Sequence, residues 1–362
     1  MNKVLYVFVA FFMLQVGAFA QTNFEELTLA KALEKAKAEN KLVFVDTYTS
    51  WCMPCKYMAN TIFPKPEMGE YLNPRFICVK YNTEEGEGAE IMKRYEISAF
   101  PTFLILNTEG AVQHKIVGGS ETAGDFIKRV AEGLDEDKAI GILAAKYEKG
   151  DRDVKLLVKY ACALLAVDDP LTIQVANELI SKLNDLQRVD SVYWFIYEHP
   201  VLTQVGSPNM EYLLANAERF QKSIGAERVN EKIATAFDFQ LTNMITGRDR
   251  QSGVEAIDKV EKEMEKYEFP SKSRLKMFVE IARAQKSGDV EKLLQVCEKN
   301  IPQIEHEYLL AMFFPLSLTI KRNGNEGQQQ RILKLAKKLL AETTNDKFKF
   351  SLGQFIPYAL EK

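Results

Sequence analysis

Short apolar runs alternate with helical patterns in the first third of the chain. Four runs rich in Val, Ile, Phe and Tyr predict strands: KLVFVDTY (41–48), RFICVKY (75–81), TFLIL (102–106) and VQHKIV (112–117). Residues 28–40 predict a helix, because their small and apolar side chains recur on one face. Strands separated by helices indicate an α/β domain whose sheet contains parallel strands.

Further patterns complete this α/β domain. Helices are expected after Cys52, over residues 89–95 and over residues 121–132. The sequence NTEG at 107–110 predicts the turn of an antiparallel hairpin at the end of the sheet. The sheet is therefore expected to be mixed.

From about residue 135 the strand pattern gives way to helical periodicity. Apolar residues recur at helical spacing, for example at Leu157, Tyr160, Ala161 and Leu164. Gly and Pro breaks cut this region into pieces of roughly 15–40 residues, the scale of helical hairpins. The sequence therefore predicts an α/β domain over residues 21–135 and an all-helical, solenoid-like domain over residues 136–362.

The first twenty residues have the pattern of a signal peptide. Lys3 precedes an apolar run over residues 4–16, and Ala18-Phe19-Ala20 has the small-x-small pattern of a cleavage site. The run is shorter than the ~18–20 apolar residues of a spanning helix, although a membrane anchor stays an alternative. The interpretation is cleavage near Ala20–Gln21 and secretion, to the periplasm, with no stable membrane insertion of the mature chain.

Composition adds limits on partners. The 362 residues carry a formal net charge of −3 and 46% of them are hydrophobic. This is the balance of a globular protein without a basic excess, so no nucleic-acid partner is expected. Five cysteines are present, and in an oxidising compartment thiols tend to pair.

Two of the cysteines lie in the segment TYTSWCMPCKYM at 47–58. The strand LVFVD ends just before it, and a helix is expected to begin near Cys52. Free N–H groups and the dipole at a helix start stabilise a thiolate, which is the species that attacks disulfides. We therefore predict Cys52, at the exposed end, as the attacking thiol and Cys55, more buried and one turn later, as the resolving thiol.

The segment WCMPCK resembles the active site of the thioredoxin family, which typically has Trp-Cys-Gly-Pro-Cys-Lys. The resemblance extends to Asp46, Lys80, FPTFLIL at 100–106 and VGG at 117–119, and covers about residues 24–131. It implies a thioredoxin-like fold, a central mixed sheet flanked by helices.

The resemblance also implies roles for individual residues. Asp46, six residues before Cys52, would be the buried acid that exchanges a proton with Cys55. Lys80 would lie near that acid. Pro101 would form a cis peptide bond and face the two sulfurs. Trp51, Pro54, Lys56 and Phe100 are supporting residues of the motif.

The chain also departs from the family pattern. Met53 stands in place of the usual Gly, Phe100 is bulkier than the common residue before the cis-proline, and Tyr48 stands where many thioredoxins have Trp. The first strand of the full fold is expected to be missing. The direction of electron flow therefore does not follow from the sequence.

Other interpretations of these residues stay open. A zinc site would need two more ligands at motif spacing, and the three His residues are scattered; no metal is expected. A purely structural disulfide would leave Asp46, Lys80 and Pro101 without a common explanation. Asp46 alone fits a satisfied strand-end acid, and Lys80 fits a structural residue.

The other three cysteines are expected to fill apolar cores. Cys78 lies in a predicted strand, and Cys162 and Cys297 lie on helices beside apolar residues. A disulfide between Cys162 and Cys297 stays open, since the sequence does not give their distance.

The leading hypothesis is a secreted thiol–disulfide oxidoreductase that exchanges disulfides with protein substrates. It needs no cofactor beyond the Cys52–Cys55 pair, but it needs a redox partner. The alternative is a non-enzymatic interaction or chaperone-like protein in which the helical domain binds a partner. A homodimer through the helical domain is open under both hypotheses.

Overall fold

The structure is a computed structural model that describes residues 21–249 and 252–361. It divides into two compact units, one ending at Leu183 and the other beginning at Asn184, and each is described by itself. The expected signal peptide at residues 1–20 lies outside the described residues.

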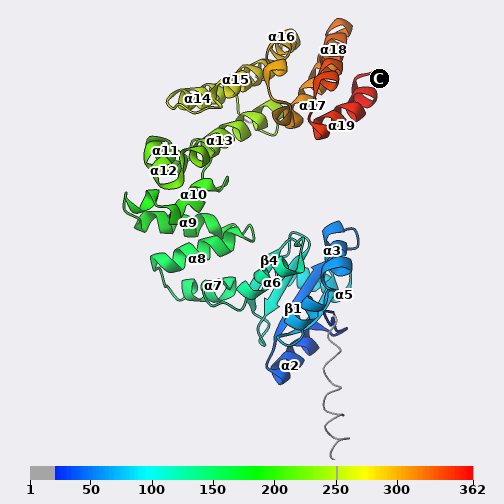
Figure 1. The fold of residues 1–362 in the computed structure, drawn as a ribbon, viewed down its shortest axis with the longest axis vertical. Helices are drawn as coiled ribbons and strands as arrows, with labels where there is room; N and C mark the ends of the chain where they lie inside the picture. Colours follow the sequence, from blue (N-terminus) through cyan, green and yellow to red (C-terminus); the bar gives the residue numbers. More distant parts are fainter. Residues whose placement is uncertain (1–20, 250–251, 362) are drawn as a thin grey trace, which may run out of the picture. The chain divides into compact units, whose positions relative to one another are not determined.

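A mixed four-stranded sheet forms the centre of the first unit (Figure 1). Its strands are β1 (Leu42–Tyr48), β2 (Phe76–Asn82), β3 (Thr102–Leu106) and β4 (Val112–Val117), in the order β2-β1-β3-β4. β1 pairs with β2 in parallel and with β3 antiparallel, and β3 and β4 form the predicted hairpin. The predicted strands and the mixed sheet are confirmed.

Helices cover both faces of this sheet. They are α2 (Leu29–Glu39), α3 (Met53–Tyr57), the π-helix η1 (Met58–Ile62), α4 (Pro66–Leu72), α5 (Gly86–Arg94) and α6 (Ala123–Glu132). The Thr28 hydroxyl accepts the Lys31 N–H and begins α2, and Asn40 ends it in the left-handed conformation. The sequence did not predict α4, whose two turns bury too few side chains to give a periodic pattern.

Alternation along β1 separates two apolar layers. Phe44 packs in an aromatic layer with Phe63, Phe103 and Phe126, whereas Val43 and Val45 belong to the layer on the other face of the sheet. Successive side chains of a strand point to opposite faces. Asp46 therefore points to the same face as Phe44, toward η1.

The N-terminal segment, residues 21–24, lies along β2 without forming a strand. Phe24 makes a single parallel bridge with Cys78. The backbone N–H of Thr22 donates to the Phe63 carbonyl at 3.0 Å. The expected lack of a regular first strand agrees with this arrangement.

Three further helices belong to the first unit: α7 (Ile140–Glu148), α8 (Val154–Leu165) and α9 (Leu171–Lys182). α7 packs so closely on β4 that a Cβ at Gly141 would lie 1.9 Å from the Val112 carbonyl oxygen. The change from strands to helices follows α6, whereas the compact units divide after Leu183. The edge strand β4 is thus covered by α7, the first helix of the predicted helical domain.

The described residues of the second unit form helices only. The α-helices are α10 (Trp194–Glu198), α11 (Pro208–Ala215), α12 (Ala217–Ile224), α13 (Ala226–Thr246), α14 (Val254–Glu265), α15 (Lys272–Ser287), α16 (Val290–Asn300), α17 (His306–Asn323), α18 (Glu326–Glu342) and α19 (Asp346–Phe355). The shorter pieces are η2 (Gln187–Val189), η3 (Ser191–Tyr193), η4 (Ile301–Gln303) and η5 (Ile356–Leu360). This confirms the predicted helical region, while its repeat character stays a prediction.

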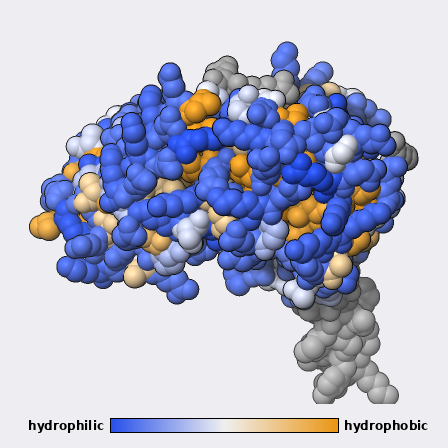
Figure 2. All heavy atoms as spheres, turned by 90° about the horizontal axis from the view of Figure 1, so that it is seen from above, coloured by the Kyte–Doolittle hydropathy of each residue, from blue (hydrophilic) through white to orange (hydrophobic). Residues whose placement is uncertain are grey.

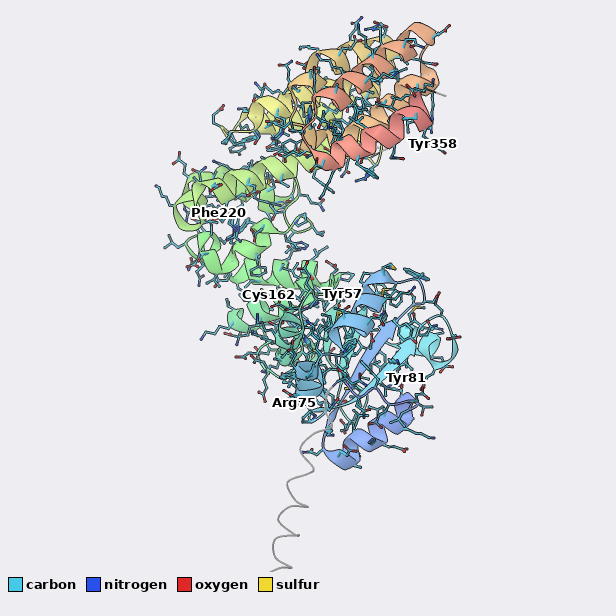
Figure 3. All side chains as sticks on the ribbon, turned by 45° about the vertical axis from the view of Figure 1, so that its right-hand side comes forward. Tyr57, Arg75, Tyr81, Cys162, Phe220 and Tyr358 are labelled. Carbon is cyan, nitrogen blue, oxygen red and sulfur yellow. A yellow bond between two sulfur atoms is a disulfide. The ribbon has the colours of Figure 1, made fainter. Side chains whose placement is uncertain are left out.

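Aromatic packing marks the start of this helical core. Phe220 of α12, labelled in Figure 3, lies 4.6 Å from Tyr197 and 5.7 Å from Trp194 between ring centroids. Trp194 and Tyr197 are both buried in the core. Hydrophilic residues predominate on the face drawn in Figure 2, with smaller apolar areas between them.

Candidate active site

Cys52 and Cys55 are joined by a disulfide at the start of α3, with their Cα atoms 5.3 Å apart. Cys52 is the N-cap residue, and its Sγ accepts the backbone N–H of Cys55 at 3.1 Å. Pro54 lies in the first turn, where a helix needs no N–H donor. The sulfur of Cys52 therefore lies where a negative charge is stabilised by backbone donors.

The relative exposure of the two cysteines differs from the prediction. The side chain of Cys52 is 3% exposed and that of Cys55 is 6% exposed, so Cys52 is not the more exposed of the two. The exposed side chains at this point are Trp51 (66%) and Met53 (70%). Both cysteine side chains are thus buried, beside two exposed neighbours.

The loop before β3 lies against the cysteine loop. The Phe100–Pro101 peptide bond is cis, as the resemblance implies, and the Phe100 ring makes an edge contact with Trp51 at 6.1 Å. The Pro101 carbonyl accepts the N–H of Gly118 at 2.8 Å. Gly118 has φ +83°, a conformation that favours glycine.

Asp46 is a buried acid on β1. Its side chain is 6% exposed, and its register partner on β2 is Lys80. Burial raises the pKa of Asp46 to about 7, and the charge of Lys80 acts in the opposite direction. The carboxyl can therefore take up or release a proton near neutral pH.

The two lysines named from the motif are both exposed. The ammonium of Lys80 lies 5.9 Å from the centre of the Phe24 ring. Lys56 lies in the last turn of α3. Of the two lysines, Lys80 is the register partner of the predicted acid, Asp46.

Contacts that the sequence did not reveal hold the loops around the site. Glu84 accepts the backbone N–H of Ser50 at 2.6 Å, and hydrogen bonds from Ser50 and Trp51 hold the pKa of Glu84 below its usual value. Tyr57, labelled in Figure 3, donates to the Glu121 carbonyl at 3.0 Å. These contacts join segments that are distant in the sequence, so no local motif predicts them.

Arg129 of α6 holds the loop after β4. Its guanidinium donates to the carbonyl oxygens of Val117, Gly118 and Gly119 at 2.6, 3.0 and 3.0 Å. Burial lowers the pKa of Arg129. The loop that meets Pro101 is therefore fixed by one side chain from outside the expected site.

The other three cysteines are free thiols. Cys78 and Cys297 are buried, as expected, and burial raises the pKa of each thiol to about 12. Cys162 on α8, labelled in Figure 3, is exposed. The expectation that Cys162 fills a core is wrong, since α8 buries the neighbouring positions Ala161 and Leu164.

Residues 21–249 and 252–361 contain no group of three or more His, Cys, Asp or Glu side chains that could hold a metal ion. In the same part of the chain, every helix is too short or too polar to span a bilayer.

Comparison with known proteins agrees with this geometry. A family model described as thioredoxin-like matches residues 23–108. Chloroplastic thioredoxin Y from Oryza sativa subsp. japonica is 35% identical over 122 residues, which cover 34% of this chain and 68% of that protein. The chain belongs to the thioredoxin-like family. The helical region lies beyond the residues that the family model matches.

Proteins named for disulfide exchange are also similar to this chain. The thiol:disulfide interchange protein DsbD of Pseudomonas fluorescens is 29% identical over 103 residues, which cover 28% of this chain but only 18% of that protein. A solution structure from Bacteroides thetaiotaomicron, described as a candidate disulphide-isomerase, is 37% identical and covers 33% of this chain and 98% of that one, with a TM-score of 0.30. This thioredoxin-like chain thus spans about a fifth of the length of DsbD.

Proposed function

We propose that this thioredoxin-like protein is a thiol–disulfide oxidoreductase that acts on protein substrates. One observation carries the proposal: the Cys52–Cys55 disulfide lies at a helix start, and the ring of Trp51, the residue before Cys52, contacts the ring of Phe100. The Cys52 sulfur accepts a backbone N–H there, and such a position favours the thiolate that disulfide exchange requires.

The first chemical step uses the reduced protein. The Cys52 thiolate attacks one sulfur of a substrate disulfide, a new S–S bond forms, and the other substrate sulfur leaves as a thiolate. Cys55 then attacks the Cys52 sulfur and releases the second substrate sulfur. Two electrons pass to the substrate, and the protein is left with the Cys52–Cys55 disulfide. The reverse sequence oxidises a dithiol.

Asp46 is the proposed proton acceptor for Cys55. The Cys55 thiol must lose its proton before it attacks, and the carboxyl of Asp46 has a pKa of about 7. Asp46 lines a cavity together with Ala59, which lies one turn after Cys55. A base whose pKa is near the working pH is suited to this transfer.

The proposal includes a location and a partner. Secretion to the periplasm with cleavage near Ala20–Gln21 rests on the pattern of the first twenty residues. The exchange requires no bound cofactor, because the electrons move between sulfur atoms. A separate redox partner must then restore the Cys52–Cys55 pair after each turnover.

The helical region supports a role in binding. Arrays of helical hairpins form extended surfaces suited to binding, and the second unit exposes large apolar side chains such as Phe239 and Phe350, at 61% and 72%. We propose that this region holds a substrate, a redox partner or a second copy of the chain. In the alternative function, this binding would be the main activity and the redox pair secondary.

Reduction of insulin by dithiothreitol separates the two functions. The wild-type protein is expected to accelerate precipitation of the insulin chains, and Cys52→Ser to abolish the acceleration. Cys162→Ser is the matched control, because it removes an exposed thiol that lies outside the site. Equal rates for wild type and Cys52→Ser would refute the enzymatic function.

A further inference from the structure

A cavity of about 370 Å³ lies between β4, α6 and α8 of the first unit. Its lining residues come after residue 108, where the match to the family model ends. Ile116, Val158 and Ala163 contribute apolar side chains, and Cys162 of α8, labelled in Figure 3, contributes a thiol. Four of the other lining side chains are basic and two are acidic, so the cavity has an excess of positive charge.

The acidic side chains of this cavity are already paired. A carboxylate oxygen of Glu132 lies 3.4 Å from the ammonium of Lys138. A carboxylate oxygen of Asp137 lies 2.8 Å from the ammonium of Lys159. Arg129 forms no ion pair with any described residue, although the charge of Glu132 acts on it at longer range. The excess charge of the cavity thus includes this guanidinium.

Arg129 still has a free donor. Its two terminal nitrogens donate to the loop after β4, whereas its Nε–H has no acceptor in the described part of the chain. The side chain is half-buried, and a cation away from water is costly without a counter-charge. This position therefore favours the entry of an anion.

His114 brings a second free donor. Its side chain is 8% exposed, and its Nδ1 accepts the N–H of Ile140 at 3.4 Å. Burial lowers the pKa of His114 to about 4, so the ring is neutral at pH 7 and carries its proton on Nε2. No described residue accepts this Nε2–H, although a nearly buried donor normally has a partner. The free nitrogens of His114 and Arg129 both keep surface that solvent reaches.

The two free donors belong to neighbouring groups. The charge of Arg129 contributes to the lowered pKa of His114, and both side chains line the cavity. A carboxylate has two oxygens, one for each donor, and a hydrogen bond to a charged acceptor is stronger than one between neutral groups. A phosphate would have no part that fits the apolar side chains of the wall.

We propose that this cavity binds a small organic carboxylate, whose oxygens accept the Arg129 Nε–H and the His114 Nε2–H while its apolar body lies against Ile116 and Val158. The site takes no part in disulfide exchange. The inference therefore goes beyond the proposed function, and each is tested without the other.

Cys162 serves as a built-in reporter of occupancy. In the oxidised protein Cys52 and Cys55 are blocked by their disulfide, and Cys78 and Cys297 are buried, which leaves Cys162 as the exposed thiol. Benzoate is the probe. It is expected to slow alkylation of Cys162 by the uncharged reagent iodoacetamide, with half-protection at roughly 1–10 mM. Ionic strength is held constant with sodium chloride, so that screening does not change along the titration.

Two further probes separate charge from shape. Benzamide has nearly the shape of benzoate without its charge, and inorganic phosphate has charge without an apolar body. Both are expected to protect at least tenfold more weakly than benzoate. Equal protection by benzamide would overturn the assignment of an anion site, and equal protection by phosphate would overturn the assignment of an organic ligand. No protection by benzoate at 10 mM would overturn the inference as a whole.

Variants at Arg129 test which group holds the carboxylate. Arg129→Gln removes the charge and is expected to raise the half-protecting concentration of benzoate roughly ten- to hundredfold. Arg129→Lys is the matched control, because it also loses the forked contacts to the loop but keeps the charge. Its half-protecting concentration should stay within about threefold of the wild type. Unchanged protection in Arg129→Gln would contradict the proposed site.

Two measurements keep the inference testable if Arg129→Gln does not fold. Ala163→Glu places a carboxylate in the cavity wall, at a half-buried position of α8 that accepts a good helix former, and it is expected to abolish protection by benzoate. The chain has three His residues, so ¹⁵N-histidine NMR resolves His114, whose Nε2 signal should move with benzoate and not with benzamide. Protection that persists in Ala163→Glu, or an unmoved His114 signal, would overturn the inference.

Discussion

Asp46 and Lys80 occupy paired positions on the neighbouring parallel strands β1 and β2. The carboxyl is buried, whereas the lysine side chain reaches solvent. Desolvation is the larger influence on the pKa of Asp46 and raises it, and the charge of Lys80 only moderates the rise. The pair thus holds an acid that ionises near neutral pH.

Asp46 is expected to make the stability of the first unit depend on pH. Its pKa is about 7 in the folded protein and about 4 in an unfolded chain. Between these values the folded state binds the proton more tightly, so the free energy of unfolding falls as pH rises through this window. Asp46→Asn removes the ionised form and is expected to stabilise the protein at pH 8 by up to about 4 kcal/mol, with little effect at pH 4.

Urea unfolding followed by Trp51 fluorescence measures this effect. The chain has two Trp residues, Trp51 and Trp194, so Trp194→Phe in the background restricts the signal to the first unit. An equal gain in stability at pH 4 and pH 8 would mean that the ionisation of Asp46 is not the cause.

Lys80→Gln is expected to raise the pKa of Asp46 further, because it removes a charge that opposes the effect of burial. The midpoint of the pH–rate profile for insulin reduction should move to higher pH. Since Lys80 is exposed, added salt should produce part of the same change in the wild type. A profile that does not move would mean that Lys80 has no electrostatic role at the site.

The strands and the acid were predictable for different reasons. The first and last residues of β3 and β4 follow from local composition, because β-branched and aromatic residues are enriched in half-buried strands. Their antiparallel pairing follows from the short turn at 107–110. The proximity of Lys80 to Asp46 was predicted from the resemblance to the thioredoxin family. The local pattern could not predict it, since the register of two strands separated in sequence is set by packing.

The cysteines show what the sequence left out. The sulfur of Cys52 accepts the Cys55 N–H at the helix start, and the neighbouring loop places the Phe100 ring against Trp51. That arrangement depends on residues about fifty positions apart in the sequence. Cys162 was predictable in principle, because the buried stripe of α8 runs through Leu157, Ala161 and Leu164 and leaves position 162 beside it.

The free thiols are expected to differ sharply in reactivity. After reduction, iodoacetamide at pH 7 should modify Cys52 before Cys162, although Cys162 is the more exposed, because the fraction of thiolate governs the rate. Cys297 is buried and its thiol pKa is raised to about 12, so it should react only on unfolding. Peptide mapping by mass spectrometry gives the order, and faster modification of Cys162 would contradict an activated Cys52.

Arg129 is expected to stabilise the loop that meets Pro101. Arg129→Ala leaves the carbonyls of Val117 and Gly118 without this donor, and the loss should destabilise the first unit by about 1–3 kcal/mol. Arg129→Lys should recover only part of the stability, because a single ammonium cannot match the planar guanidinium that reaches all three carbonyls. Urea unfolding with Trp51 fluorescence measures both variants, and full recovery with lysine would show that charge, and not the forked geometry, fixes the loop.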